Sequence, residues 1–79
     1  MKSDLIISVP KTKLREIKEK ILQYTIVDRV TSRTARGKHG VTYPDYADIS
    51  VFVKPLWQLP ETAEFNRQFL AIQDLQYSH

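Results

Sequence analysis

A chain of 79 residues with 42% hydrophobic residues can form one core but not two, so we expect a single domain spanning residues 1–79. The sequence contains no cysteine, which excludes disulfides, thiolate metal sites and cysteine nucleophiles. The formal net charge is +3, with ten Lys/Arg against four Asp/Glu in residues 1–40 and two against five in residues 41–79. This asymmetry favours an anionic partner for one side of the molecule.

The apolar runs of the sequence are short. The longest of them hold about five residues, too few to cross a bilayer. The apolar run near the N-terminus is also too short for a signal peptide. We therefore expect a cytoplasmic protein that makes no contact with membranes.

Two elements are predicted in the first third of the chain. Residues 5–9 form a β-branched run that ends at Pro10, which predicts a strand, and its apolar character on both faces predicts a central position in the sheet. From Lys13 onward the apolar residues recur at helical spacing, which predicts a helix over residues 13–24 with Thr12 as its N-cap. The stripe of this helix consists of Leu14, Ile17, Ile21, Leu22 and Tyr24.

The middle of the chain predicts two further strands, over residues 26–34 and 49–53. The first of these carries cations, which is typical of a strand at the edge of a sheet. If this strand is regular, one of its faces holds Val27, Arg29, Thr31 and Arg33.

Residues 35–48 are predicted to be a long connection between these strands. Gly37 and Gly40 lie on either side of Lys38 and His39, and the dipeptide at 44–45 suits the centre of a type I turn. Hairpin loops usually hold two to five residues, and a loop of about fourteen is often functional. Alternatively, part of the segment, around residues 41–43, extends the strands.

The last third predicts a second helix. An apolar connector at residues 56–59 is expected to pack against the core, and Pro60 is expected in the first turn of the helix that follows. The apolar stripe of this helix is Ala63, Phe65, Phe69, Leu70 and Ile72. The tail at 74–79 is either a short fourth strand or a frayed end.

The predicted order is β-α-β-β-α with a possible last β. It favours the α+β class, specifically a ferredoxin-like split βαβ antiparallel sheet with two helices on one face. In that topology the strands at 5–9 and 49–53 are central and the strand at 26–34 lies outside. Without a fourth strand, the first strand has an unpaired edge through which the protein could form a homo-oligomer.

No residue pattern indicates a metal, a cofactor or an enzyme. The only histidines are His39 and His79, and neither belongs to a metal-binding motif. Phosphate-binding glycine motifs are also absent from the sequence. The least favoured alternative is a small phosphodiesterase or nuclease, in which His39 acts as general base and Arg36 or Lys38 holds the phosphate.

The favoured hypothesis is a non-catalytic binding or regulatory protein with a basic strand-and-loop surface. Arginine binds carboxylates with two parallel hydrogen bonds, and aromatic side chains beside arginine are common interface anchors. The expected partner is an acidic protein surface, including that of an enzyme which the protein inhibits or redirects. The residues expected to bind it are Arg29, Arg33, Arg36, Lys38, His39, Tyr43 and Tyr46.

The second hypothesis is a nucleic-acid-binding module. The same cations could contact phosphates, while Tyr43 and Tyr46 stack on bases. An RNA-recognition motif, however, needs aromatic residues on the two central strands. The strand at 5–9 has none, and the strand at 49–53 offers only Phe52.

Overall fold

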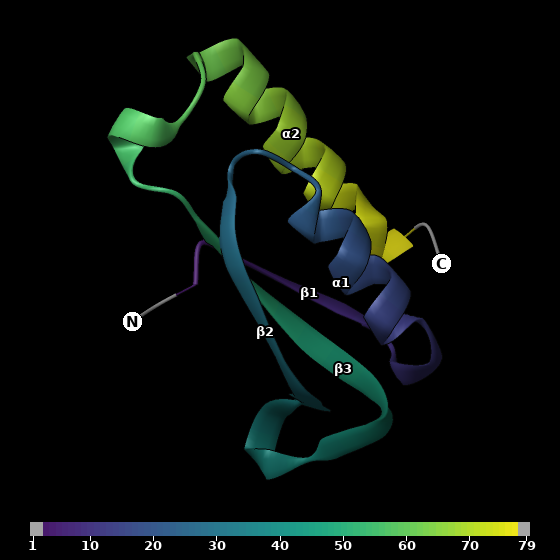
Figure 1. The fold of residues 1–79 in the computed structure, drawn as a ribbon. Coiled ribbons are helices and arrows are strands. Elements are labelled where there is room, and N and C mark those ends of the chain that lie inside the picture. Colours follow the sequence, from purple (N-terminus) through teal and green to yellow (C-terminus); the bar gives the residue numbers. More distant parts are fainter. Residues whose placement is uncertain (1–2, 78–79) are drawn as a thin grey trace.

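The protein is an antiparallel sheet of three strands with two α-helices, as seen in a computed structural model that describes residues 3–77 (Figure 1). This arrangement confirms the predicted α+β class. The strands follow one another across the sheet in the order β1-β3-β2. In chain order the elements are β1 (Leu5–Pro10), α1 (Leu14–Leu22), β2 (Val27–Arg36), β3 (Thr42–Val53) and α2 (Thr62–Asp74).

The sheet has no fourth strand within residues 3–77. A ferredoxin-like order requires one beside β1, but Leu75–Tyr77 forms a 3₁₀-helix at the end of α2. Leu75 packs against the core in this conformation. Consequently β1 lies at the edge, and the prediction that it is central is wrong. The remainder of the predicted tail, residues 78–79, lies outside the described residues.

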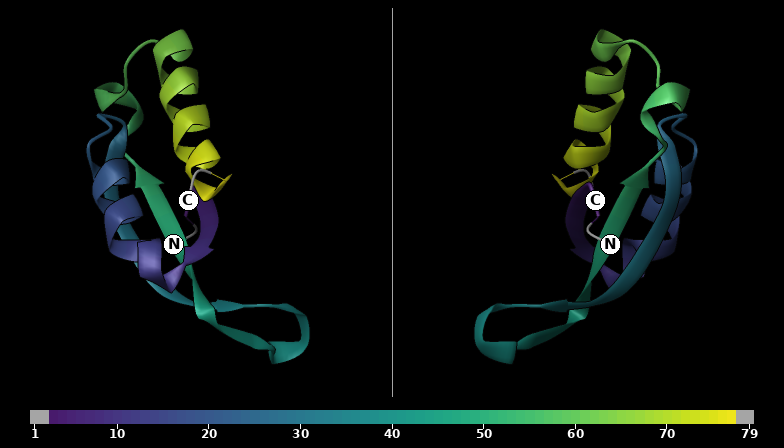
Figure 2. Two further views of the ribbon diagram at one scale, coloured as in Figure 1. Left: turned by 90° about the vertical axis from the view of Figure 1, so that its right-hand side faces the viewer. Right: turned by 90° about the vertical axis from the view of Figure 1, so that its left-hand side faces the viewer.

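Both helices cover the same face of the sheet (Figure 2). Alternation along the strands turns Ile7 and Val9 of β1 and Ile49 and Val51 of β3 toward the helices, where they are fully buried. The helices and the turn after α1 cover them with apolar side chains that include Ile17, Ile21, Ile26 and Ile72. The sheet is therefore apolar on its helix side.

An irregularity near the start of β2 changes which residues share a face. The pairing with β3 shifts between Val27 and Arg29, so Asp28 is an extra residue in the ladder. Val27 is buried in the core as a result, while Arg29 is exposed. The prediction that Val27 shares a strand face with Arg29, Thr31 and Arg33 is therefore wrong. The other three residues do share one face.

The predicted long connection at residues 35–48 is mostly a β-hairpin. Strand β2 continues to Arg36 and β3 begins at Thr42, which confirms the alternative of extended strands. The predicted turn at 44–45 is wrong, because these residues lie within β3. They belong to a second irregularity, since Thr34 pairs with Ala47 but Ala35 pairs with Tyr43. Beyond it, residues 35–43 project from the rest of the sheet, and we call them the arm (Figure 2).

The connector between β3 and α2 packs only in part, through Leu59. Residues Leu56–Gln58 form a 3₁₀-helix in which Leu56 and Trp57 are 83% and 82% exposed. Leu59 packs against the core. The turn closed by the hydrogen bond from the Gln58 amide to the Pro55 carbonyl holds Leu56 and Trp57 away from it.

Each helix begins later than predicted. Lys11–Lys13 is a 3₁₀-helix, and the side chain of Thr12 does not cap the helix that follows. Helix α2 begins at Thr62, so Pro60 precedes it rather than lying in its first turn. On α2, Ile72 is buried as predicted, but Leu70 is 57% exposed.

An ion pair on α2 predicts a dependence of stability on pH. Hydrogen bonds from Arg67 and Gln68 lower the pKa of Glu64 from 4.5 to about 2. A carboxylate with a lowered pKa stabilises the fold above its unfolded-state pKa, and this contribution disappears as the pH falls from 4.5 toward 2. We expect urea unfolding to show a smaller loss of stability over this pH range for Glu64→Gln than for the wild type. Equal losses would contradict the assignment.

Candidate partner-binding surface

One face of the sheet carries no helix, and we call it the open face. Strand alternation and register bring to it side chains that are polar or cationic, with only two apolar members. They are Ile6 and Ser8 of β1, Asp48, Ser50 and Phe52 of β3, and Arg29, Thr31 and Arg33 of β2. Two of the seven predicted partner-binding residues, Arg29 and Arg33, therefore lie on one surface.

Arg29 and Phe52 form a cation–π pair on the open face. They are cross-strand partners, and the guanidinium carbon of Arg29 lies 4.1 Å from the centroid of the Phe52 ring. At an exposed site such a pair contributes roughly 0.5–1 kcal/mol. The guanidinium also covers one side of the ring, which reduces the surface that a nucleic-acid base could use for stacking.

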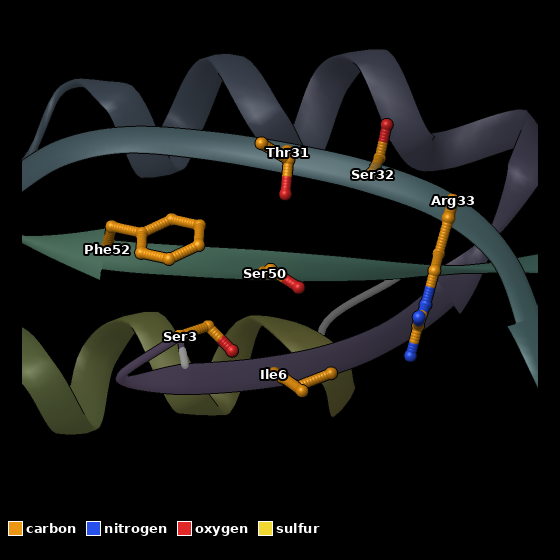
Figure 3. Close-up of a pocket in the computed structure, with 7 residues that line it drawn as sticks. All are labelled: Ser3, Ile6, Thr31, Ser32, Arg33, Ser50 and Phe52. Atoms are coloured by element: carbon orange, nitrogen blue, oxygen red, sulfur yellow. The ribbon is translucent and has the colours of Figure 1, made fainter. Parts of the chain in front are cut away.

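Arg33 faces a nearly buried carboxylate without forming an ion pair with it. Its cross-strand partner is Asp48, whose carboxylate accepts a hydrogen bond from the Ser8 hydroxyl at 2.6 Å. Arg33 extends from β2 across β3 toward β1 (Figure 3). Its guanidinium therefore reaches over the sheet toward the strand that carries Ile6.

The open face contains a shallow depression of about 570 Å³. Its lining combines one cation, four hydroxyl side chains and two apolar side chains (Figure 3). They are Arg33, Ser3, Thr31, Ser32, Ser50, Ile6 and Phe52. Because most of its lining residues are polar or charged, the depression suits a polar or charged group better than an apolar ligand.

The tip of the arm holds three more of the predicted residues in exposed positions: Arg36, Lys38 and His39. The tip is closed by a hydrogen bond from the Gly37 amide to the Val41 carbonyl at 2.7 Å. His39 and Gly40 both have left-handed backbone conformations, with φ of 61° and 77°. The turn thus presents cations in succession at the end of the hairpin.

Tyr43 lies over the backbone of Gly37 across the arm. A Cβ added at Gly37 would lie 2.7 Å from Cε2 and 2.8 Å from the oxygen of the Tyr43 ring. We expect Gly37→Ala to displace this ring and to change its NMR chemical shifts, with little effect on global stability because a side chain rather than the backbone must move. Lys38→Ala is the control, since Lys38 is an exposed residue of the same turn whose φ is not positive. Equal changes in the Tyr43 ring shifts would contradict the contact.

Tyr46 is separated from Tyr43 by the irregularity in β3. It pairs with Pro10 of β1 and is 47% exposed. Six of the seven predicted residues consequently fall into two groups, and Tyr46 lies between them. Arg29 and Arg33 lie on the open face, Arg36, Lys38, His39 and Tyr43 lie on the arm, and Tyr46 lies where the arm joins the sheet.

The cations of these two groups differ from those of the helices in their ion pairing. Within residues 3–77, Arg29, Arg33, Arg36 and Lys38 form no ion pair, although carboxylates are present on the same strands. Four helix-side cations, Lys13, Arg15, Lys20 and Arg67, each pair with a nearby glutamate, whereas Lys18 of α1 forms no ion pair within these residues. The positive charge of β2 and the arm is therefore available to a partner.

Sequence reasoning placed Thr31 on a strand face with Arg29 and Arg33 but did not name Ile6, Thr31, Ser50 or Phe52 as partner-binding residues. Strand alternation places Ser50 and Phe52 opposite the apolar face of β3. The missing information was the register between strands, which puts Thr31 beside Ser50 and Arg29 beside Phe52.

Other kinds of site are not evident in the described part of the chain. Residues 3–77 contain no group of three or more histidines and carboxylates placed to hold a metal ion. None of their helices combines the length and apolar character that a membrane span requires. His39 does not line the depression on the open face.

Comparison of the chain with protein-family models, curated proteins and solved structures finds no match to any of them.

Proposed function

We propose that this protein is a non-catalytic binding module whose open face and arm receive an acidic surface of a protein partner. The observation that carries the proposal is the absence of ion pairs from Arg29, Arg33, Arg36 and Lys38 among residues 3–77. Exposed and unpaired arginines gain strong, charge-assisted hydrogen bonds when a carboxylate arrives.

The neighbours of these cations favour a protein over a nucleic acid. Ile6 and Val41 are half-exposed beside the cationic residues, and apolar contacts next to arginine suit a protein interface. Base stacking needs free aromatic rings, but the Phe52 ring is covered on one side by Arg29 and the Tyr43 ring packs against Gly37. Tyr46 is half-exposed without such a contact.

The test compares two variants that each lose four positive charges, from different parts of the molecule. One replaces Arg29, Arg33, Arg36 and Lys38 with glutamine, and the other replaces Lys13, Arg15, Lys18 and Lys20 of the α1 side. Each lowers the formal net charge from +3 to −1. The probe is fluorescein-labelled octaglutamate, and fluorescence anisotropy at low salt gives its affinity.

We expect the strand-and-arm variant to bind octaglutamate at least about tenfold more weakly than the helix variant, because its lost cations would contact carboxylates directly. Equal affinities would show that net charge alone attracts the peptide and would overturn the proposal. Single-stranded DNA or RNA of equal charge provides the comparison of classes. Tighter binding of either nucleic acid than of octaglutamate would favour the nucleic-acid module instead.

A further inference from the structure

We infer that the depression on the open face is a subsite for one carboxylate side chain of the acidic partner, held by Arg33 and by the hydroxyls of Thr31 and Ser50. This inference rests on the proposed function and specifies which group of the partner is recognised. Its starting point is the arginine that crosses the sheet without an ion-pair partner among residues 3–77 (Figure 3).

The hydroxyls around Arg33 are also free to donate. Within residues 3–77, the side chains of Thr31 and Ser50 make no hydrogen bond, whereas the neighbouring hydroxyl of Ser8 is used by Asp48. Thr31 and Ser50 are cross-strand partners on the open face, so their hydroxyls lie beside each other. A guanidinium with two adjacent hydroxyls matches the several lone pairs of a carboxylate.

The apolar walls fit the carbon chain that carries such a carboxylate. Ile6, which is 51% exposed, lies on one side of the depression, and Phe52 lies on the other side. A glutamate or aspartate side chain could place its methylene groups between them while its charged end meets Arg33. Free inorganic anions would gain nothing from these walls.

The single arginine of the site favours a carboxylate over a phosphate. Asp48, the cross-strand partner of Arg33, is nearly buried and opposes any anion placed here. Because attraction to Arg33 and repulsion from Asp48 both double for a dianion, the preference rests on the match between one guanidinium and the two oxygens of one carboxylate. Arg29, the other arginine of the open face, does not line the depression. One arginine is therefore available at the depression, as a single carboxylate requires.

The test follows the side-chain Nε–H signal of Arg33 by NMR as octaglutamate is added to the full chain. We expect this signal to shift, Arg33→Lys to weaken binding roughly tenfold because lysine cannot form two parallel bonds, and the double variant Thr31→Val/Ser50→Ala to weaken it roughly threefold. The matched control is Arg15→Lys on the exposed side of α1, where Arg15 is 95% exposed, and it should bind as the wild type does.

The outcomes separate the subsite from the proposed function. Suppose that the wild type binds octaglutamate and the strand-and-arm variant does not, but that Arg33→Lys and Thr31→Val/Ser50→Ala bind normally. In that case the subsite is wrong and the proposed function stands. If inorganic phosphate shifts the Arg33 signal at lower concentrations than acetate does, the preference for a carboxylate is wrong. If the wild type does not bind octaglutamate, both proposals fail.

Discussion

Ile49→Ala is expected to lower the free energy of unfolding by about 4 kcal/mol. Ile49 lies on the central strand with none of its surface exposed, and it pairs with Ile7 on one side and Ser32 on the other. Removing three buried carbons forfeits their transfer free energy and leaves a cavity, which together cost about 2–5 kcal/mol. A domain of this size has a total stability of about 4–12 kcal/mol. The variant should therefore be close to unfolding without denaturant.

The measurement is urea unfolding monitored by circular dichroism. The control is Trp57→Ala, which removes a larger side chain that is 82% exposed. It should change the free energy of unfolding by no more than about 0.5 kcal/mol. A greater loss for Trp57→Ala than for Ile49→Ala would show that the core lies elsewhere.

Gln68→Leu should destabilise the protein by about 3 kcal/mol although it adds apolar surface. Gln68 is only 6% exposed, and its side-chain oxygen accepts a hydrogen bond from the buried Ile26 amide at 3.3 Å. It also exchanges hydrogen bonds with the Thr25 hydroxyl and donates to Glu64 at 3.1 Å. Leucine would leave the Ile26 amide without a partner in a buried place, at a cost of about 1–3 kcal/mol for that group alone.

Gln73→Leu is the matched control, since Gln73 is a partly buried residue of α2 that makes no side-chain hydrogen bond within residues 3–77. Its effect on the urea midpoint should be small. A second readout follows Glu64, whose low pKa depends partly on Gln68. In Gln68→Leu the pKa of Glu64 should rise above its wild-type value of about 2. If the pKa of Glu64 and the stability both stay unchanged, the network does not connect α2 to the turn before β2.

The core was largely predictable because strand alternation and helical spacing depend only on local sequence. The pattern correctly placed Ile49 and Val51 on one side of their strand and Ile17 and Ile21 on the buried side of α1. Gln68 was missed because a polar residue on an apolar stripe is ordinarily expected to face solvent. Gln68 is buried where it accepts a hydrogen bond from the Ile26 amide, and the two residues are distant in sequence and meet only in the folded chain.

The strand irregularities could not be predicted from pattern alone. Asp28 shifts the register at the start of β2, and it carries no signal that separates it from a regular strand residue. Residues 44–45 resemble a turn, yet they lie within β3 because the hairpin continues beyond them to the arm. Leu56 and Trp57 are also exposed, although their apolar side chains predicted packing against the core.

The candidate site was predictable in its charges and not in its shape. The sequence alone shows that Arg29 and Arg33 are spaced to share a strand face. That Arg33 crosses the sheet beside Thr31 and Ser50 depends on pairing between strands that are distant in sequence. Likewise, the arm separates Lys38 from these residues although all belong to one basic segment.

The most direct test of the central claim is a map of backbone amide chemical shifts on addition of octaglutamate. Binding to the basic strand and arm predicts that the largest changes fall on residues 29–33 and 35–43, with α1 and the exposed turn Leu56–Gln58 unaffected. Largest changes on α1, where Arg15 and Lys20 are already paired with glutamates, would contradict the account.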